Sequence, residues 1–365
     1  MPEFDILKIH KPSSSFRVLS VAGTYDLQTT SIEERFVGKI DLPDEWNIGL
    51  IVGKSGSGKT TIARQLFNEI IIENFEYKCD SVLDDMPKQC TVKQICKAFN
   101  SVGFSTPPSW LKPYSVLSNG EKMRCDLARA ILEDKEMFCF DEYTSVVDRN
   151  VAKIGSLAMQ KAIRKANKKF IAVTCHYDVE EWLMPDWIFN ADTMTFHLNE
   201  ELKKNKPVIK LDVYETREKQ KFWDMFKKYH YLSHSFNKSA RVFLCLCNGH
   251  LCGMCAVLSF PHPKRKNTWK EHRTVIFPDY QGIGIGSRFT NEIAELFKQE
   301  NKSFISTSSN PAFIHSRKND SKWIVTKIGR QNTGSNSGKI HKKGSTSSKR
   351  ITASFEYIGH EQISE

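Results

Sequence analysis

One octapeptide, Gly-Lys-Ser-Gly-Ser-Gly-Lys-Thr at residues 53–60, constrains the fold more than any other part of this sequence. It matches the pattern G-x-x-x-x-G-K-[ST], in which glycines let successive backbone N–H groups turn toward phosphate oxygens. Residues 48–52 before it are an apolar run typical of a buried strand, and residues 61–67 after it have helical composition. A strand, this loop and a helix predict an α/β domain that places phosphates at a helix N-terminus.

Two side chains of the loop have separate expected roles. Lys59 is expected to reach the β- and γ-phosphates of ATP, and Thr60 is expected to hold Mg²⁺. A glycine-rich turn that arose by chance is the alternative interpretation, but such a turn requires neither a strand before it nor a helix after it. The residues expected to surround the phosphates are Gly53, Ser55, Gly56, Gly58, Lys59, Thr60 and Thr61.

A pair of carboxylates follows a later apolar segment, residues 137–140. Asp141 is expected to hold Mg²⁺ through water, and Glu142 is expected to polarise the attacking water as a general base. Residues 170–174 form another buried strand, and His176 follows it. A histidine in that position is either structural or catalytic.

These segments, in this order, resemble the ABC-type ATPase family over roughly residues 15–200. Leu117–Glu121 looks like the LSGGQ signature of the family, with Asn119 in place of one glycine. Ser145–Asp148 looks like its D-loop, and His176 looks like its switch histidine. The family hydrolyses ATP between two head-to-tail copies, so the resemblance implies a homodimer.

The resemblance also assigns two residues across that dimer. Ser118 and Gly120 are expected to contact the γ-phosphate bound by the other subunit. The sequence departs from the family in its spacing, because only 56 residues separate Thr60 from Leu117. No glutamine stands out as the Q-loop residue. The positions considered for it are Asp84, Asp85, Gln89 and Gln94, and the aromatic residues considered for stacking on adenine, or alternatively for the core, are Tyr25 and Phe16.

Charge is distributed unevenly along the chain. Residues 201–365 carry 29 Lys and Arg against 14 Asp and Glu, whereas residues 1–200 carry 24 against 28. A strongly basic C-terminal part predicts a polyanionic partner, with DNA or RNA as the first candidate. No window of 18 apolar residues predicts a membrane span, the N-terminus does not resemble a signal peptide, and scattered cysteines suit a reducing compartment. We therefore expect a cytoplasmic protein without a membrane partner.

A polar, charged stretch at residues 200–207 predicts a domain boundary, giving an ATPase domain at 1–203 and a second domain at 204–365. Within the second domain, residues 331–350 are rich in Ser, Gly and Lys and are expected to be a mobile basic loop. This loop is either a clamp for a phosphate backbone or a plain linker.

The second domain shows a regular series of expected elements. Residues 208–214 alternate like a strand, and residues 218–229 have helical spacing. Asn248-Gly249 between two apolar runs, over 242–258, predicts a β-hairpin. A further strand at 272–277 leads into a glycine-rich turn and another helix, an arrangement suited to binding an anion.

The frame Gln281-x-x-Gly284-x-Gly286 resembles the acetyl-CoA pyrophosphate loop of the GNAT acetyltransferases, over about residues 208–360. A dinucleotide-binding fingerprint is the alternative, and the preceding antiparallel hairpin argues against it because that fingerprint needs a βαβ unit. The fold class implied is therefore α/β, a P-loop ABC-type ATPase domain followed by an α+β GNAT-like acyltransferase domain. The residues expected to bind acetyl-CoA are Gln281, Gly282, Gly284, Gly286 and Ser287.

Shorter segments resemble phage-type proteins that fuse an ABC ATPase to a GNAT domain, and also phage DNA-modification proteins of the Mom type, which act on adenine in DNA. The segments are Lys228–Ser233, Pro278–Gly286 and Asn310–Phe313. His230 and Tyr231 lie in the first of them and are the chosen catalytic residues, with a role in packing as the alternative.

Other polar residues of this domain leave alternatives open. Asp279 and Tyr357 are further candidates for acid–base chemistry. Four cysteines near the predicted hairpin are either zinc ligands or small buried hydrophobic residues, and regular strand alternation favours the second interpretation. They are Cys245, Cys247, Cys252 and Cys255.

Three functions are compatible with these patterns. The first is an enzyme that transfers an acyl or related group from acetyl-CoA to a nucleic-acid base, with the ATPase driving or gating engagement. The second is a protein or small-amine N-acetyltransferase regulated by its ATPase. The third is a non-enzymatic DNA-binding ABC protein with a degenerate GNAT domain.

Overall fold

The computed structural model of the chain describes residues 3–27, 32–199, 207–230, 235–261, 267–330 and 351–359. The predicted basic loop at 331–350 therefore lies outside the described residues. Among those that are described, no helix combines the length and the apolar character needed to cross a bilayer.

Contacts divide the chain into two compact units. Unit 1 comprises Met1–Tyr77 and Asp126–Pro207, and unit 2 comprises Lys78–Cys125 and Val208–Glu365. The sequence predicted two consecutive domains, and it did not anticipate that residues 78–125 pack with the C-terminal part. We call residues 78–125 the insert.

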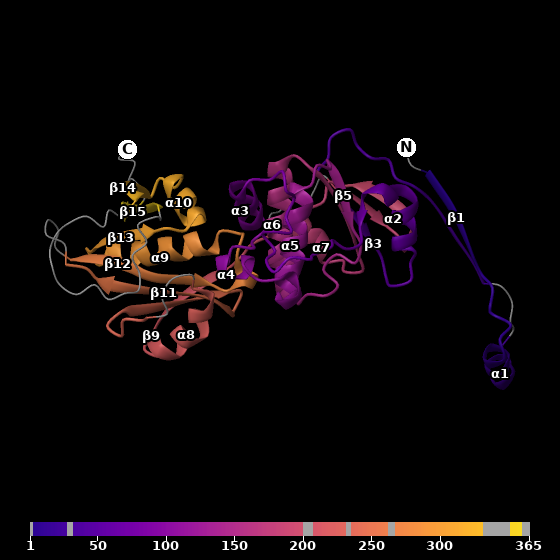
Figure 1. Cartoon of the computed structure of the whole chain (residues 1–365), viewed down its shortest axis with the longest axis horizontal. Coiled ribbons are helices and arrows are strands. Elements are labelled where there is room, and N and C mark those ends of the chain that lie inside the picture. Colours follow the sequence, from indigo (N-terminus) through magenta and orange to yellow (C-terminus); the bar gives the residue numbers. More distant parts are fainter. Residues whose placement is uncertain are drawn as a thin grey trace. The chain divides into compact units, whose positions relative to one another are not determined.

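Unit 1 is built on a six-stranded sheet in the order β4-β5-β6-β3-β7-β8. Two of its strands, β3 and β5, are labelled in Figure 1. The strands from β4 to β7 run parallel, and β8 pairs antiparallel with β7. Every residue of β3 is buried, as expected for a central strand covered on both faces. The strands are β3 (Ile48–Val52), β4 (Ile71–Ile72), β5 (Met137–Phe140), β6 (Lys169–Thr174), β7 (Trp187–Asn190) and β8 (Thr195–Leu198).

The helices of unit 1 begin and end at recognisable caps. The side chain of Asp148 accepts a hydrogen bond of 2.8 Å from the N–H of Asn150 at the start of α6, and Asn167 ends that helix in the left-handed conformation. The D-loop-like segment therefore leads directly into a capped helix. The elements are α2 (Lys59–Phe67), η1 (Asn68–Ile70), α6 (Arg149–Ala166) and α7 (Val179–Leu183).

A hairpin of β1 (Glu3–His10) and β2 (Ile32–Lys39) is anchored in the core of unit 1 through two phenylalanines. Phe4 lies edge-on to Phe189 with ring centroids 5.7 Å apart, and Phe36 is buried in the same cluster. Helix α1 (Phe16–Thr24) follows β1 and buries none of its side chains.

Unit 2 contains a seven-stranded sheet in the order β14-β15-β13-β12-β11-β10-β9. All neighbouring pairs are antiparallel except β12 and β13, which run parallel. This parallel pairing covers only three residues, Thr268–Lys270 opposite Ser303–Ile305. The strands are β9 (Leu211–Thr216), β10 (Arg241–Cys247), β11 (His250–Ser259), β12 (Thr268–Ile276), β13 (Ser303–Ser308), β14 (Trp323–Arg330) and β15 (Ile351–Tyr357).

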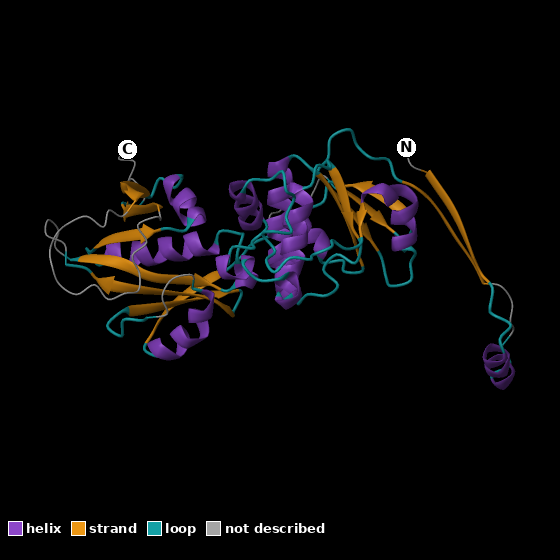
Figure 2. Ribbon diagram, in the orientation of Figure 1, coloured by secondary structure: helices purple, strands orange, loops and turns teal. Residues whose placement is uncertain are grey.

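Helices lie on both faces of this sheet (Figure 2). Alternating side chains of β10 contact these helices. Val242 packs with Trp223 of α8 (Lys219–Phe226), whereas the ring of its neighbour Phe243 lies 6.0 Å from that of Phe297 on α9 (Ile285–Gln299). The predicted hairpin is confirmed: β10 and β11 are joined at Asn248 and Gly249, whose φ angles are +50° and +84°. The predicted class, α/β with an α+β second part, is also confirmed.

The insert forms a small aromatic cluster of its own. The rings of Phe99 and Phe104 lie 5.0 Å apart, and the indole N–H of Trp110 donates a hydrogen bond of 2.9 Å to the carbonyl of Phe104. A reciprocal capping box between Thr91 and Gln94 starts its first helix. The elements of the insert are α3 (Val92–Ser101), α4 (Pro107–Trp110), η2 (Tyr114–Val116) and the start of α5 (Asn119–Leu132).

Candidate functional site

The loop between β3 and α2 has the backbone that its glycines predict. Gly56 and Gly58 have φ angles of +86° and +84°, and Gly58 is the N-cap of α2. A Cβ atom at Gly58 would lie 2.5 Å from the ring of Phe36, so glycine is required there for packing as well as for conformation. The ammonium of Lys59, which is largely buried, donates a hydrogen bond of 2.7 Å to the carbonyl of Lys54.

The predicted carboxylates lie at the same edge of the sheet as this loop. Strands β5, β6 and β3 are parallel neighbours, so their carboxyl ends meet at one edge. There the N–H of Glu142 donates to Asp141 Oδ1 at 2.9 Å, and Ser145 Oγ donates to Glu142 Oε2 at 2.6 Å. Glu142 has a φ of +53°, an uncommon conformation for a residue other than glycine.

His176 lies close to these carboxylates. Its Nδ1 is 3.4 Å from Thr144 Oγ1. Burial and the nearby Arg149 guanidinium lower the pKa of His176, partly offset by Asp178 and Glu142. The imidazole is therefore neutral near pH 7 and can both donate and accept one hydrogen bond.

Unit 1 does not bring the other residues predicted for the nucleotide site to this edge of its sheet. Ser118 is exposed and Gly120 is buried, and both belong to unit 2, where Ser118 hydrogen-bonds to Glu121. Phe16 and Tyr25 are exposed rather than part of the core. Among the described residues, no group of three or more His, Cys, Asp and Glu side chains could hold a metal ion, so Thr60 and Asp141 stay predictions as Mg²⁺ contacts.

The second glycine loop, residues 281–287, joins β12 to α9 through η4 (Pro278–Tyr280). Gly282 and Gly284 have φ angles of +92° and +85°, and Gly284 is the N-cap of α9. Within the described part of the chain, the N–H groups of Gly282, Ile283 and Gly284 donate to no backbone carbonyl. Consecutive free N–H groups at a helix N-terminus form an anion-binding concavity.

This loop opens into a cavity of about 300 Å³ in unit 2. The cavity lies where the three-residue pairing of β12 and β13 has ended, so the parts of both strands that no longer pair with each other face it. The cavity is lined by residues of the loop, β12, β13, the start of α10 (Pro311–Lys318) and part of the insert. Residues in its wall include Ser105, His230, His272, Gly284, Ser308 and Phe313.

A protein-family model described as the acetyltransferase (GNAT) family matches residues 177–315. This part of the chain contains a GNAT acetyltransferase domain. The matched residues extend from unit 1 through β9–β13 and α9 of unit 2 and end within α10, so they include the glycine loop and most of the cavity wall.

Comparison with solved structures gives matches for both parts of the chain. The dimeric structure of a bacterial ABC transporter cassette matches with 16% identity and a TM-score of 0.35, covering 43% of this chain and 87% of that chain. The IAA acetyltransferase from Bacillus cereus ATCC 14579 matches with 12% identity and a TM-score of 0.31, covering 40% of this chain and 99% of that chain. No curated protein matches the chain in sequence.

Glu271 in the cavity wall belongs to a buried ion pair that the sequence analysis missed. Glu271 Oε2 lies 2.7 Å from Arg317 Nη2, and both side chains are almost fully buried. Burial opposes ionisation of Glu271, but the charge of Arg317 and hydrogen bonds from Ser306, Thr274 and Arg317 keep the pKa of this carboxyl below its ordinary value. The pair is therefore charged at neutral pH, and it lies between the diverging strands.

His272, the next residue of β12, was also missed. Burial, together with Arg273 and Lys270, lowers its pKa to about 4, so the ring is neutral at physiological pH. Its Nε2 is buried and has no hydrogen-bond partner among the described residues. A neutral imidazole with a free ring nitrogen in a cavity wall can accept a proton. A run of five polar residues, 270–274, directly before the apolar residues 275–277 was the available signal.

The predicted GNAT catalytic residues have different outcomes. His230 lies in the cavity wall, largely buried, with its ring edge-on to Trp223 at 5.7 Å. Tyr231 lies outside the described residues. Tyr357 donates a hydrogen bond of 2.9 Å to Glu295, which with burial raises its pKa, and it is not in the cavity wall.

The side chain of Gln281 is directed to protein groups. Its Oε1 accepts a hydrogen bond of 3.1 Å from the N–H of Ser105, and its Nε2 donates to the carbonyl of Ile276 at 2.8 Å. The neighbouring Gly282, Gly284, Gly286 and Ser287 line the cavity, and their role in binding acetyl-CoA stays a prediction. The four cysteines of the hairpin are buried, and the thiols of Cys245 and Cys252 contact each other.

Proposed function

We propose that the chain is an acyltransferase that takes an acyl group from acetyl-CoA in the GNAT cavity and transfers it to a nucleic-acid base. The observation that carries this proposal is the loop at residues 282–284, whose N–H groups donate to no backbone carbonyl among the described residues and whose two glycines line the cavity. Unit 1 is proposed to bind and hydrolyse ATP with Mg²⁺ and to control this reaction.

The loop fits the pyrophosphate of acetyl-CoA on chemical grounds. Gly282 and Gly284 hold left-handed conformations that turn neighbouring N–H groups toward one side, and α9 adds the partial positive charge of its N-terminus. Gly286 and Ser287 continue this wall in the first turn of α9. Bound acetyl-CoA would supply the acyl group as a thioester.

The acceptor must lose a proton as it attacks the thioester carbon, and the carbon–sulfur bond breaks so that coenzyme A leaves as a thiolate, which then takes up a proton. His272 is neutral, and its Nε2 is available to accept that proton. His230 lies in the same wall and is the second candidate for this role. The Glu271–Arg317 pair balances its own charge, so it adds little net field to the cavity while fixing β12 against α10.

A nucleic-acid acceptor is supported by charge. Residues 201–365 carry 29 basic against 14 acidic residues, and this excess is suited to a phosphate backbone. DNA is the proposed acceptor, and RNA is the alternative polyanion.

The ATPase role rests on the edge of the six-stranded sheet. By this proposal Lys59 contacts the β- and γ-phosphates, Thr60 and Asp141 hold Mg²⁺, and Glu142 activates the attacking water. Neutral His176 would contact the γ-phosphate. A homodimer would bring Ser118 and Gly120 of one copy to the nucleotide of the other.

The test is nucleoside mass spectrometry of DNA and tRNA from cells that express the wild type or Gly284→Glu. Gly284 has a φ of +85°, and a carboxylate there would repel the pyrophosphate. Gly249→Glu is the matched control, because Gly249 has a φ of +84°, lies in a hairpin turn and has no atom within 4 Å of an added Cβ.

A new nucleoside mass with wild type and Gly249→Glu, but not with Gly284→Glu, supports the proposal and identifies the group. Unmodified DNA and tRNA at full expression contradict a nucleic-acid acceptor and favour a protein or small amine. An assay of the purified protein distinguishes the two acceptors further. A rate of ATP hydrolysis that rises when DNA is added supports transfer to a nucleic-acid base, and a rate that does not change supports transfer to a protein or small amine.

A further inference from the structure

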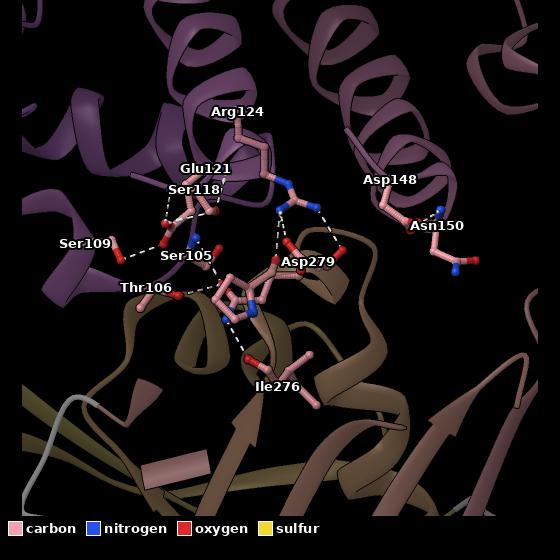
Figure 3. A network of polar contacts seen from close by, with 12 residues as sticks. Ser105, Thr106, Ser109, Ser118, Glu121, Arg124, Asp148, Asn150, Ile276 and Asp279 are labelled. Carbon is pink, nitrogen blue, oxygen red and sulfur yellow. Dashed lines mark hydrogen bonds and ion pairs between the residues drawn. The ribbon is translucent and has the colours of Figure 1, made fainter. Parts of the chain in front are cut away.

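Arg124 of the insert holds the segment that precedes the acyl-CoA loop. Its side chain is 1% exposed. Nη1 donates to the carbonyl of Pro278 at 3.1 Å, and Nη2 donates to the carbonyl of Asp279 at 2.8 Å (Figure 3). The Asp279 carboxylate lies 3.6 Å from the same guanidinium. A planar guanidinium that donates to two successive carbonyls fixes the backbone between them.

A second contact lies three residues before the glycine at the N-cap of α9. Through its side chain, Gln281 joins the N–H of Ser105 in the insert to the carbonyl of Ile276 at the end of β12. Gly103 lies against the same point, because a Cβ atom there would be 2.5 Å from the carbonyl oxygen of Gln281. Arg124 and Ser105 thus hold both η4 and the first residue of the loop.

The insert also forms part of the cavity itself. Asn100, Ser105 and Pro107 lie in its wall, beside residues of β12 and the glycine loop. Since the loop and the cavity both depend on these residues, the acyl-CoA site is built from two segments that are far apart in the sequence.

The same helix that carries Arg124 begins at the signature-like motif. The carboxylate of Glu121 accepts hydrogen bonds from the N–H and hydroxyl of Ser118, both at 3.1 Å, and from the hydroxyl of Ser109 at 2.7 Å (Figure 3). Glu121 and Arg124 are separated by one turn of α5. A displacement of the Ser118–Glu121 turn is therefore transmitted to Arg124 through a continuous helix.

We propose that the insert is a working part of the acyl-CoA site, in which Arg124 positions the pyrophosphate loop, and that nucleotide engaged at Ser118 and Gly120 changes acyl-CoA affinity through α5. This inference rests on the proposed function, since it takes acetyl-CoA and ATP as the ligands. It identifies a positioning residue for one site and the route by which the ATPase regulates it.

The first experiment measures acetyl-CoA binding by calorimetry with the full chain and no nucleotide. Arg124→Gln is expected to raise the Kd about tenfold, because the loop loses two charge-assisted hydrogen bonds, and Arg124→Lys is expected to fall between it and wild type. Arg129→Gln is the control, because Arg129 also lies on α5 and donates to a carbonyl, that of Glu76 in unit 1.

Acetyl-pantetheine separates positioning from a general loss of structure, because it lacks the pyrophosphate. Its affinity is expected to be the same for wild type and Arg124→Gln. An equal loss for acetyl-pantetheine and acetyl-CoA means that the cavity has collapsed, and it overturns the positioning role. An unchanged acetyl-CoA Kd in Arg124→Gln overturns it as well.

The second experiment tests coupling in Glu142→Gln, which is expected to retain ATP. Saturating ATP should change the acetyl-CoA Kd about fivefold or more, and acetyl-CoA should change the ATP Kd by the same factor, because linkage is reciprocal. Adding Arg124→Gln should abolish both changes. Independent binding of the two ligands would overturn the coupling, whereas a wild type that binds no acetyl-CoA would overturn the proposed function itself.

Discussion

The loops at 53–60 and 281–287 share a backbone plan and differ in where their positive charge lies. In each, a glycine with φ near +85° is the N-cap of the following helix, Gly58 for α2 and Gly284 for α9. The first loop contains Lys54 and Lys59, whereas the second contains no basic residue. The guanidinium of Arg124, which contacts the segment before the second loop, is directed to carbonyls of η4.

This difference matches the chemistry proposed for each loop. A lysine in the loop can stabilise the negative charge that develops on the phosphates during ATP hydrolysis. A pyrophosphate that only anchors a cofactor undergoes no such change, so neutral N–H donors in a fixed backbone are sufficient for it. One loop thus contributes to chemistry, and the other contributes to positioning.

Exchange of Lys59 for alanine gives the largest expected effect. ATP hydrolysis should fall about a thousandfold, because the transition state loses its cation. Acetyl-CoA binding without nucleotide should stay at the wild-type value. The measurements are steady-state phosphate release and calorimetry. Lys54→Ala, which removes a lysine from the same loop but keeps the carbonyl that Lys59 contacts, is the control, and an equal loss in both variants would contradict a specific role for Lys59.

The second site is expected to be sensitive to removal of a charge buried in its wall. Glu271→Gln should lower the free energy of unfolding by about 3–4 kcal/mol, because Arg317 is left as an unpaired buried cation. Replacing both residues by methionine should recover most of that loss. Chemical denaturation of the two variants checks this, and a double variant no more stable than Glu271→Gln would argue against charge as the cause.

The two N-cap glycines provide a direct test of the shared backbone plan. Gly284→Ala should cost about 1 kcal/mol of stability, which is the conformational strain alone. Gly58→Ala should cost about 2–3 kcal/mol, because a Cβ there also meets the ring of Phe36 at 2.5 Å. Thermal unfolding of both proteins measures the difference. Equal losses would show that Phe36 moves aside.

The smallest expected effect concerns pH. The pKa of His272 is about 4 in the folded chain and 6.5 in its ordinary state, so the unfolded chain binds more protons between these values. Stability should therefore fall as pH drops from 6.5 to 4, by about 1 kcal/mol for this group after allowance for its partial exposure. His272→Phe should remove that share. Identical pH profiles for the two proteins would contradict a neutral, desolvated ring.

Local signals in the sequence predict much of this fold. The strands at 48–52 and 137–140 have the predicted bounds, and the Asn248-Gly249 turn joins the predicted hairpin. Strand β12 begins at Thr268 rather than at the predicted residue 272. Its first residues pair with β13, a partner more than 30 residues later, and that pairing has no local signature.

The residues of the candidate sites also fall into those that a local sequence motif reveals and those that only the fold brings together. Both glycine loops are visible because each motif is contiguous. The pair of Glu271 and Arg317 is not, because each residue resembles an ordinary charged surface residue until the fold buries them together. The association of residues 78–125 with unit 2 depends on Arg124 and Gln281, whose partners are more than 150 residues away in sequence.

Residues 126–207 of unit 1 lie between the two segments of unit 2 in the sequence, so the ribosome synthesises the insert well before the rest of unit 2. Arg124 leaves the ribosome before its partners at Pro278 and Asp279, and at about 5–20 residues per second this delay is about 8–30 s. During that interval the strands of unit 1 are completed, while the insert lacks the surface that covers Arg124. The strands of the six-stranded sheet are therefore all synthesised before the segments that complete the cavity wall.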